Sequence, residues 1–128
     1  MVIVQKAVIK RGDKYLILKR SPDAVNFPGF WDFPGGKLEK GEEPFLGVER
    51  EVLEETGLKA KAVKVIAKTN IDVLNTGNPT HQFVLYESKD EGGEIILSKE
   101  HTAFRWETKE EILKLEIEPY MQVYFNDK

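Results

Sequence analysis

Three glutamates near the middle of the chain are spaced so that they could bind one metal ion together. Glu51, Glu54 and Glu55 stand at positions i, i+3 and i+4, which places their side chains on one face of a helix. Like charges at this spacing destabilise a helix by roughly a few tenths of a kcal/mol per pair. A divalent cation would reverse that effect, and carboxylate oxygens suit Mg²⁺, Mn²⁺ or Ca²⁺ better than Zn²⁺. The alternative reading is an acidic helix face that is simply solvated.

The helix that carries these glutamates is expected to run from about Pro44 to Thr56. Pro44 suits the first helical turn, because its missing N–H would be unpaired there in any case. Gly57 suits the helix end, where the chain has to adopt a left-handed conformation. Four apolar residues are available for the buried side of the helix: Leu46, Val48, Val52 and Leu53.

The sequence around this helix resembles the Nudix box. The pattern G-x5-E-x7-R-E-U-x-E-E-x-G-U, with U a bulky apolar residue, is matched at every specified position between Gly36 and Leu58. Its seven fixed letters each occur at about one position in fifteen in average proteins, so chance agreement is negligible. The preceding segment WDFPGGK, residues Trp31–Lys37, is similar to MutT-like Nudix proteins. By this resemblance the chain is identified as a MutT-like Nudix hydrolase.

The resemblance implies metal-dependent hydrolysis of a phosphoanhydride bond in a nucleoside diphosphate derivative. Carried over by position, Glu51, Glu54 and Glu55 are the metal ligands, and the carbonyl of Gly36 is an additional candidate ligand. Arg50 is expected to pair with carboxylates and to hold them in place, so Arg50, Glu54 and Glu55 form the expected catalytic set. Mg²⁺ is the expected cofactor, with Mn²⁺ as an alternative.

The residue that activates the water stays open at this point. In some family members a glutamate of the box does so, and in others a glutamate from a loop beyond the central strands. Glu100 lies in such a loop, although an ordinary exposed carboxylate is an equal alternative. His101 could assist, but we expect it to be exposed to solvent. Glu42 is expected to orient the site rather than to bind the metal directly.

The substrate is the least determined part of this interpretation. An aromatic slot should stack a base, and asparagine or backbone groups should read its edge, which makes Phe27, Phe30, Phe83 and Asn126 candidates. The small size and the WDFPGG run favour a nucleoside triphosphate pyrophosphohydrolase that yields a monophosphate and pyrophosphate. An ADP-ribose or other nucleotide-sugar pyrophosphatase is one alternative. A non-catalytic nucleotide-binding module is another, but the complete set of box glutamates disfavours it.

Composition and charge limit the class of protein further. The chain has 128 residues, of which 41% are hydrophobic and 32% charged, as expected for one globular domain over residues 1–128. A net charge of −3 gives no general attraction to nucleic acid or anionic membranes, and the family resemblance implies a small nucleotide as the partner. No cysteine, signal-peptide pattern or membrane-length apolar run is present in the sequence. These features predict a cytoplasmic protein, and a homodimer is left open.

The remaining patterns predict a mixed sheet with helices on both faces. This α/β/α sandwich is also what the resemblance implies, as the Nudix fold. Alternating or buried apolar runs predict strands at Val2–Lys10, Tyr15–Lys19, Lys59–Leu74, Thr80–Ser88 and Glu94–Leu97, and near Phe104–Trp106. A capping-box signature predicts a short helix from Thr108 to about Leu115, and Pro119 is expected to begin the last helix.

Overall fold

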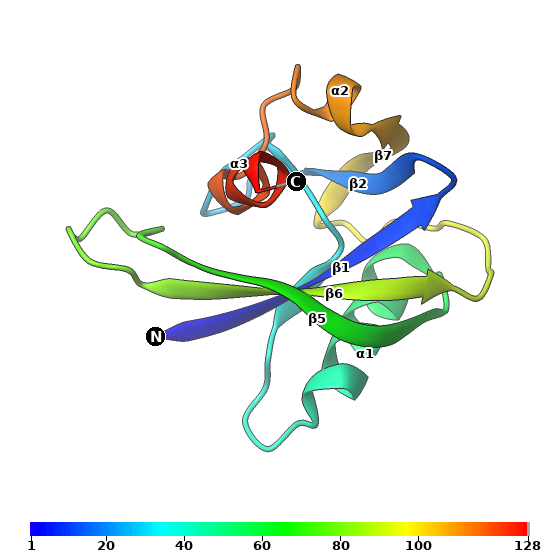
Figure 1. Cartoon of the computed structure of the whole chain (residues 1–128), viewed down its shortest axis with the longest axis horizontal. Helices are drawn as coiled ribbons and strands as arrows, with labels where there is room; N and C mark the ends of the chain where they lie inside the picture. Colours follow the sequence, from blue (N-terminus) through cyan, green and yellow to red (C-terminus); the bar gives the residue numbers. More distant parts are fainter. Residues whose placement is uncertain (128) are drawn as a thin grey trace.

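Seven strands and three helices make up the described residues, 1–127, of the computed structural model (Figure 1). The strands are β1 (Val2–Arg11), β2 (Lys14–Arg20), β3 (Trp31–Asp32), β4 (Gly35–Lys37), β5 (Ala60–Ile71), β6 (His81–Asp90) and β7 (His101–Thr108). The helices are α1 (Pro44–Thr56), α2 (Lys109–Ile112) and α3 (Pro119–Asn126). None of these helices is long and apolar enough to cross a membrane.

The sheet is organised around β1, which changes partners along its length. One edge of β1 pairs in parallel with β6, which in turn pairs antiparallel with β5. Residues Val4–Lys6 of β1 also pair antiparallel with β4, whereas Lys10 and Arg11 pair with β2. β2 then pairs with both β3 and β7. The point where β1 exchanges β4 for β2 is therefore the place where segments from several parts of the chain meet.

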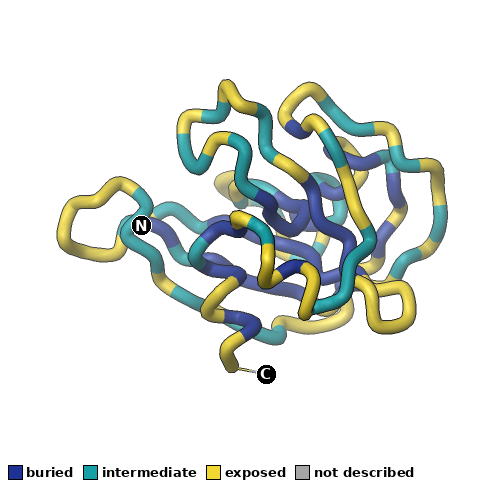
Figure 2. Tube along the Cα trace, turned by 90° about the horizontal axis from the view of Figure 1, so that it is seen from above, coloured by how far each residue is buried: buried dark blue, intermediate teal, exposed yellow. Residues whose placement is uncertain are grey.

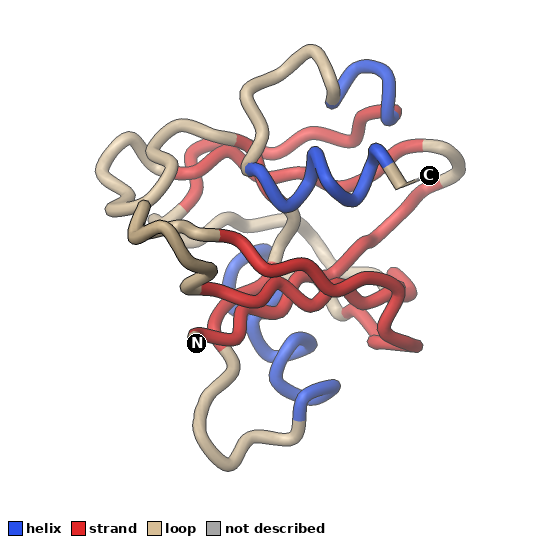
Figure 3. The backbone as a smooth tube through the Cα atoms, turned by 60° about the vertical axis from the view of Figure 1, so that its left-hand side comes forward, coloured by secondary structure: helices blue, strands red, loops and turns tan. Residues whose placement is uncertain are grey.

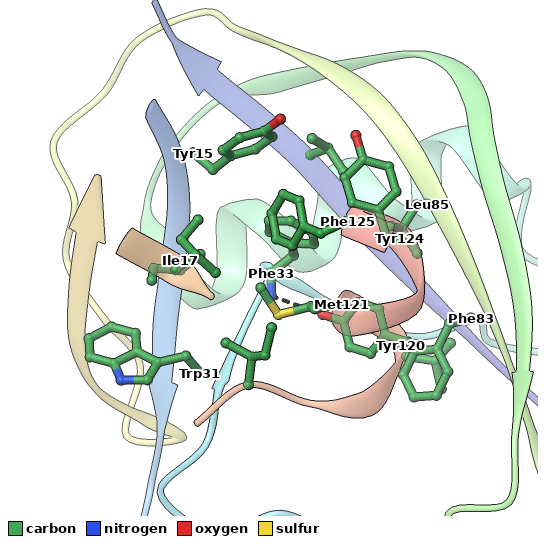
Figure 4. Packing of buried hydrophobic residues seen from close by; sticks show 14 residues of the cluster. Tyr15, Ile17, Trp31, Phe33, Phe83, Leu85, Tyr120, Met121, Tyr124 and Phe125 are labelled. Atoms are coloured by element: carbon green, nitrogen blue, oxygen red, sulfur yellow. Dashed lines mark hydrogen bonds between the residues drawn. The ribbon is translucent and has the colours of Figure 1, made fainter. Parts of the chain in front are cut away.

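Helices cover both faces of this mixed sheet, which confirms the α/β/α sandwich. α1 and α3 lie on opposite sides of the strands (Figure 3), and buried residues concentrate in the strands between them (Figure 2). On the α3 side, aromatic side chains fill the core around Phe33, which is fully buried and donates its N–H to the hydroxyl of Tyr120 at 2.9 Å (Figure 4). On the α1 side, smaller aliphatic residues of β1, β2 and β5 pack against Val48 and Val52.

Local chemistry at its two ends explains the bounds of α1, which confirm the predicted range. The side chain of Glu43 caps the helix by accepting from the N–H groups of Phe45 and Leu46. Gly57 ends it in a left-handed conformation, with φ of 75°, as glycine permits. The predicted apolar side was wrong in part, because Leu46 and Leu53 are 59% and 50% exposed.

The strand predicted at Glu94–Leu97 is not formed, and this expectation was wrong. The segment instead runs past the end of α1. Ile96 donates its N–H to the carbonyl of Thr56 at 2.9 Å, and Ser98 donates to the carbonyl of Glu55 at 3.0 Å. Carbonyls in the last turn of a helix lack partners within that helix. The segment therefore satisfies the end of α1 and holds the chain that leads to Glu100 beside the acidic helix.

Candidate active site

A cavity of about 360 Å³ opens beside the acidic helix. Two kinds of side chain line it. Glu51, Glu55 and Glu100 supply carboxylates, whereas Phe27 and Phe83 supply aromatic surface. The other residues that line the cavity are Val4, Lys6, Arg20, Asn26, Gly35, Gly36, Lys37, Val73, His81 and Glu118. This size and mixture suit a small polar ligand with an aromatic part.

Glu51 lies against the backbone of Gly36. A Cβ atom placed on Gly36 would come within 2.5 Å of Oε2 of Glu51, so this carboxylate and the Gly36 peptide fit together only because no side chain intervenes. Burial raises the pKa of Glu51, against the opposing charge of Arg50, and the nearby charges of Glu54 and Glu100 raise it further. The glutamate of the helix and the glutamate of the distant loop therefore share one electrostatic environment.

Glu55 is the most deeply buried carboxylate of α1. Its side chain accepts a 2.8 Å hydrogen bond at Oε1 from the N–H of Gly35. Burial raises its pKa to about 7, although the charges of Lys6 and His101 act in the opposite direction. A buried carboxylate with a raised pKa favours a nearby cation, because a cation would restore the ionised form.

Arg50 joins the carboxylates of the helix to the loop that precedes it. Its Nε donates to Oε2 of Glu42 at 2.6 Å, and its Nη1 lies 3.1 Å from oxygens of both Glu51 and Glu54. These contacts hold the pKa of Arg50 above its usual value, mainly through the bond to Glu42. The expected pairing of Arg50 with carboxylates is therefore present. Glu54 itself is exposed, with a side chain 59% accessible, and does not line the cavity.

A buried charge cluster lies next to the cavity and centres on Asp32. Oδ2 of Asp32 accepts from Nζ of Lys6 at 3.1 Å and from Nη1 of Arg20 at 3.3 Å, and Oδ1 lies 3.3 Å from Nε2 of His101. Burial alone would raise the pKa of Asp32, but the charge of Lys6 and the contact with His101 hold it well below its usual value. The pKa of Glu118 is shifted in the opposite direction, because burial and the charge of Asp32 raise it to about 8.

The oxygen donors around Glu51 fit a hard divalent cation, but they are not yet gathered around one point. Within residues 1–127 no three acidic or histidine side chains are already arranged to hold a metal ion. Arg50 engages Glu51 and Glu54 instead. The close approach of Glu51 to Gly36 and the buried carboxylate of Glu55 give carboxylate and carbonyl oxygens, which are the ligands that Mg²⁺ and Mn²⁺ prefer. Arg50 therefore keeps the carboxylates of Glu51 and Glu54 next to one another, on the side of α1 where a cation could bind them.

The structure gathers some of the predicted residues and separates others. Glu100, Phe27 and Phe83 line the cavity together with the box residues. Phe30 contacts Phe27, with ring centroids 5.5 Å apart, but does not line the cavity. Asn126 is exposed at the end of α3 and also lies outside the cavity lining. We therefore assign no substrate contact to Phe30 or Asn126.

Sequence reasoning missed most of the buried charge cluster. His101 was expected to be exposed, which was wrong, since it is buried beside Asp32. A signal for Lys6 was present, because a lysine interrupts a strand whose neighbours on the same face, Val4 and Val8, are apolar. Glu118 stands directly before the proline that begins α3 but makes no side-chain cap. The burial of Glu118 could not be predicted from that position in the sequence.

Comparisons with known proteins agree with this fold and with the box. The family model described as the NUDIX domain matches residues 3–127. A MutT-like protein of Streptomyces ambofaciens is 34% identical over 124 residues, covering 93% of this chain and 71% of that protein. The CTP pyrophosphohydrolase of Escherichia coli K12 is 30% identical over 119 residues, covering 93% and 84%. The crystal structure of a MutT protein from Methanosarcina mazei superposes with a TM-score of 0.83, at 27% identity, over 98% of this chain and 91% of that one.

The chain therefore belongs to the Nudix family, and it is a hydrolase of that family. The α/β/α sandwich and the complete box, which runs from Gly36 through α1 to Leu58, are the features that define this class here.

Proposed function

We propose that this protein is a nucleoside triphosphate pyrophosphohydrolase that uses Mg²⁺, or Mn²⁺ in its place, and releases a nucleoside monophosphate and pyrophosphate. The single observation that carries the proposal is the shared cavity. It joins Glu51, Glu55 and Glu100 to the aromatic surfaces of Phe27 and Phe83. A nucleotide has the complementary parts, a polyphosphate that requires cations and a base that stacks on aromatic rings.

The proposed chemistry needs three things from the chain: ligands for the metal ion, a group that orients those ligands, and a general base. Glu51, Glu54 and Glu55, with the Gly36 carbonyl, would hold the metal ion. When bound, the ion neutralises phosphate charge and favours attack by water. Arg50 keeps the carboxylates oriented before the ion enters.

Glu100 is the proposed general base, because it lines the cavity and acts electrostatically on Glu51. It would take the proton from the attacking water as the new phosphorus–oxygen bond forms. The bond between the α phosphorus and the bridging oxygen, or between that oxygen and the β phosphorus, then breaks. The products are one monophosphate and one pyrophosphate.

The names of several relatives support nucleotides as the substrate class. Besides the proteins compared above, relatives named nucleoside triphosphatase NudI and asymmetrical bis(5'-nucleosyl)-tetraphosphatase are 26% and 30% identical to this chain. A structure named as an ADP-ribose pyrophosphatase superposes with a TM-score of 0.67 at 27% identity. The triphosphate is our first choice because the CTP pyrophosphohydrolase and MutT-like relatives match over more of this chain.

The test is hydrolysis of a nucleotide panel with Mg²⁺ and separately with Mn²⁺, following monophosphate and pyrophosphate. The panel contains ordinary and oxidised nucleoside triphosphates, ADP-ribose, NADH and diadenosine polyphosphates. Glu54→Gln should lower kcat by at least about a hundredfold, because loss of a group that only orients a metal ligand already costs about 10-fold to 100-fold. Glu110→Gln is the matched control, since Glu110 is an exposed glutamate of α2 outside the cavity.

The outcome of this panel distinguishes a triphosphate pyrophosphohydrolase from an ADP-ribose pyrophosphatase and from a non-catalytic binding module. Turnover of a triphosphate to monophosphate and pyrophosphate, lost in Glu54→Gln and kept in Glu110→Gln, supports the proposal. Preferred turnover of ADP-ribose would replace the substrate while retaining the reaction class. Nucleotide binding without turnover of any substrate would show a non-catalytic module.

A further inference from the structure

Lys6 is a buried cation between two apolar residues on the same face of β1. It is 4% exposed, and its neighbours on the same face of β1, Val4 and Val8, belong to the apolar core. Burying a charge is costly unless it is paired, and replacing a buried ion pair by apolar residues is often neutral or stabilising. Fold stability alone therefore gives no reason for a lysine here.

Two oxygen atoms receive hydrogen bonds from this lysine. Nζ donates to Oδ2 of Asp32 at 3.1 Å and to the carbonyl of Gly35 at 3.3 Å. Asp32 itself accepts a hydrogen bond from Arg20 of β2, and its Oδ1 lies 3.3 Å from Nε2 of His101 of β7. The ammonium group is thus anchored on one side and holds a backbone carbonyl on the other.

The backbone of Gly35 connects this lysine to the acidic helix. The N–H of Gly35 donates to Oε1 of Glu55 at 2.8 Å, while its carbonyl accepts from Lys6. Gly35 has φ of +144°, and a Cβ there would come within 2.0 Å of the carbonyl oxygen of Gln5. Only glycine allows this approach to β1, and glycine is also the residue most free to move. The hydrogen bond from Lys6 therefore adds a second constraint, besides the bond to Glu55, that limits the motion of the Gly35 backbone.

We propose that Lys6, anchored by Asp32, is a positioning residue that fixes the backbone of Gly35 and so sets Glu55, which accepts from the Gly35 N–H, and the adjoining Gly36 carbonyl for the metal ion. The proposal deepens the function proposed above and rests on it for the identity of the site as a metal site. Lys6 acts through the peptide and needs no contact with the substrate. Groups that orient metal ligands in this way are typically worth about 10-fold to 100-fold in metal affinity.

The test compares Lys6→Met with Lys10→Met. Lys10 lies on the same face of β1, but it is exposed, sits over the ring of Tyr15 and lies outside the cavity. Three quantities are measured: amide hydrogen exchange of Gly35 without metal, Mn²⁺ affinity by electron paramagnetic resonance without nucleotide, and kcat and KM with the best substrate. For Lys6→Met we expect about tenfold faster exchange at Gly35, about tenfold weaker Mn²⁺ binding and a lower kcat with little change in KM. Lys10→Met should match the wild type in all three.

Two results would overturn the proposal. In one, Lys6→Met binds Mn²⁺ within twofold of the wild type. In the other, Mn²⁺ binding weakens but exchange at Gly35 stays unchanged, which would place the effect elsewhere than at the Gly35 backbone. If Lys6→Met does not melt cooperatively, the same measurements are made on Asp32→Asn. This variant keeps the shape of the Asp32 side chain but weakens its interaction with Lys6.

The failure of this inference is distinguishable from failure of the proposed function. Exchange and Mn²⁺ binding are both measured without nucleotide. A wild type that binds Mn²⁺ but hydrolyses no nucleotide would overturn the proposed function alone. A wild type that hydrolyses nucleotide, with Lys6→Met unchanged in exchange and binding, would overturn only the role of Lys6.

Discussion

The guanidinium of Arg50 and the carboxylate of Glu42 form a paired contact, with Nε to Oε2 at 2.6 Å and Nη2 to Oε1 at 3.2 Å. Two parallel bonds of this kind fix the plane of the guanidinium. The remaining nitrogen, Nη1, then faces Glu51 and Glu54. Glu42 therefore acts on the acidic face of α1 through Arg50.

Arg50→Lys should show what this fixed plane contributes. A lysine keeps the positive charge but cannot pair with Glu42 through two parallel bonds. We expect Mn²⁺ affinity and kcat each to fall by about tenfold, because the carboxylates lose their common partner. The measurements are Mn²⁺ titration and steady-state kinetics. Arg105→Lys serves as the control, since Arg105 is an exposed residue of β7 over the ring of Trp31. A variant that retains wild-type affinity and rate would show that charge alone suffices.

Glu100→Gln separates proton transfer from metal binding. If Glu100 takes the proton from water, its loss should lower kcat by about 10²-fold to 10⁴-fold. Mn²⁺ affinity should remain within a few fold of the wild type, because Glu51 and Glu55 are unchanged. Glu94→Gln, at an exposed position earlier in the same segment, is the control. A small effect on kcat would indicate that a glutamate of the box, and not Glu100, is the general base.

Local signals in the sequence were sufficient for α1 and for its acidic face. The first-turn proline and the terminal glycine act within a few residues, so the range Pro44–Thr56 was predicted correctly. The strand predicted at Glu94–Leu97 was wrong because local signals were not sufficient there. A short apolar segment can pair in a sheet or satisfy a helix end, and only the fold determines which. The exposed Leu46 and Leu53 show that helical periodicity alone did not identify the buried face.

The buried charge cluster beside the cavity could not be predicted, because its residues meet only through long-range contacts. Lys6 and Asp32 are 26 positions apart, and in the neighbouring core the bond from Phe33 to Tyr120 spans 87. His101 reaches Asp32 only because β7 pairs with β2. Apart from Lys6, each of these residues looks ordinary within its own segment.

Metal binding should depend on pH through Glu55. Its pKa is raised to about 7, chiefly by burial, and a metal ion binds only the ionised carboxylate. Below pH 7 the ion must therefore displace a proton, so Mn²⁺ affinity should rise by up to about tenfold per pH unit and level off above pH 7. Mn²⁺ titrations between about pH 5.5 and 8.5 measure this slope. Glu55→Gln should bind more weakly and lose the slope near pH 7. Equal affinity across this range in the wild type would contradict the prediction.

The stability of the metal-free protein should depend on pH through Glu118. Its pKa is about 8 in the folded state against 4.5 for an ordinary glutamate, because of burial and the charge of Asp32. A group with a raised folded pKa contributes stability that is fully present below its unfolded pKa and is lost as pH rises through the folded value. Stability should therefore decline from about pH 4.5 to pH 8. Glu55 acts in the same direction only up to about pH 7, so the interval from pH 7 to 8 reports mainly on Glu118.

Glu118→Gln should remove that decline, because an amide keeps the shape and stays neutral at every pH. Urea unfolding at pH 6, 7, 8 and 9 measures the free energy of unfolding, and the variant should give a flatter profile and higher stability at pH 9. Glu116→Gln is the matched control, since Glu116 is exposed two residues earlier and its profile should follow the wild type. At the acid end Asp32, whose pKa is lowered in the folded state, contributes stability that is lost as pH falls. Both variants should therefore still lose stability in strong acid, and parallel profiles of Glu118→Gln and the wild type between pH 7 and 9 would show that Glu118 is ionised without cost in the fold.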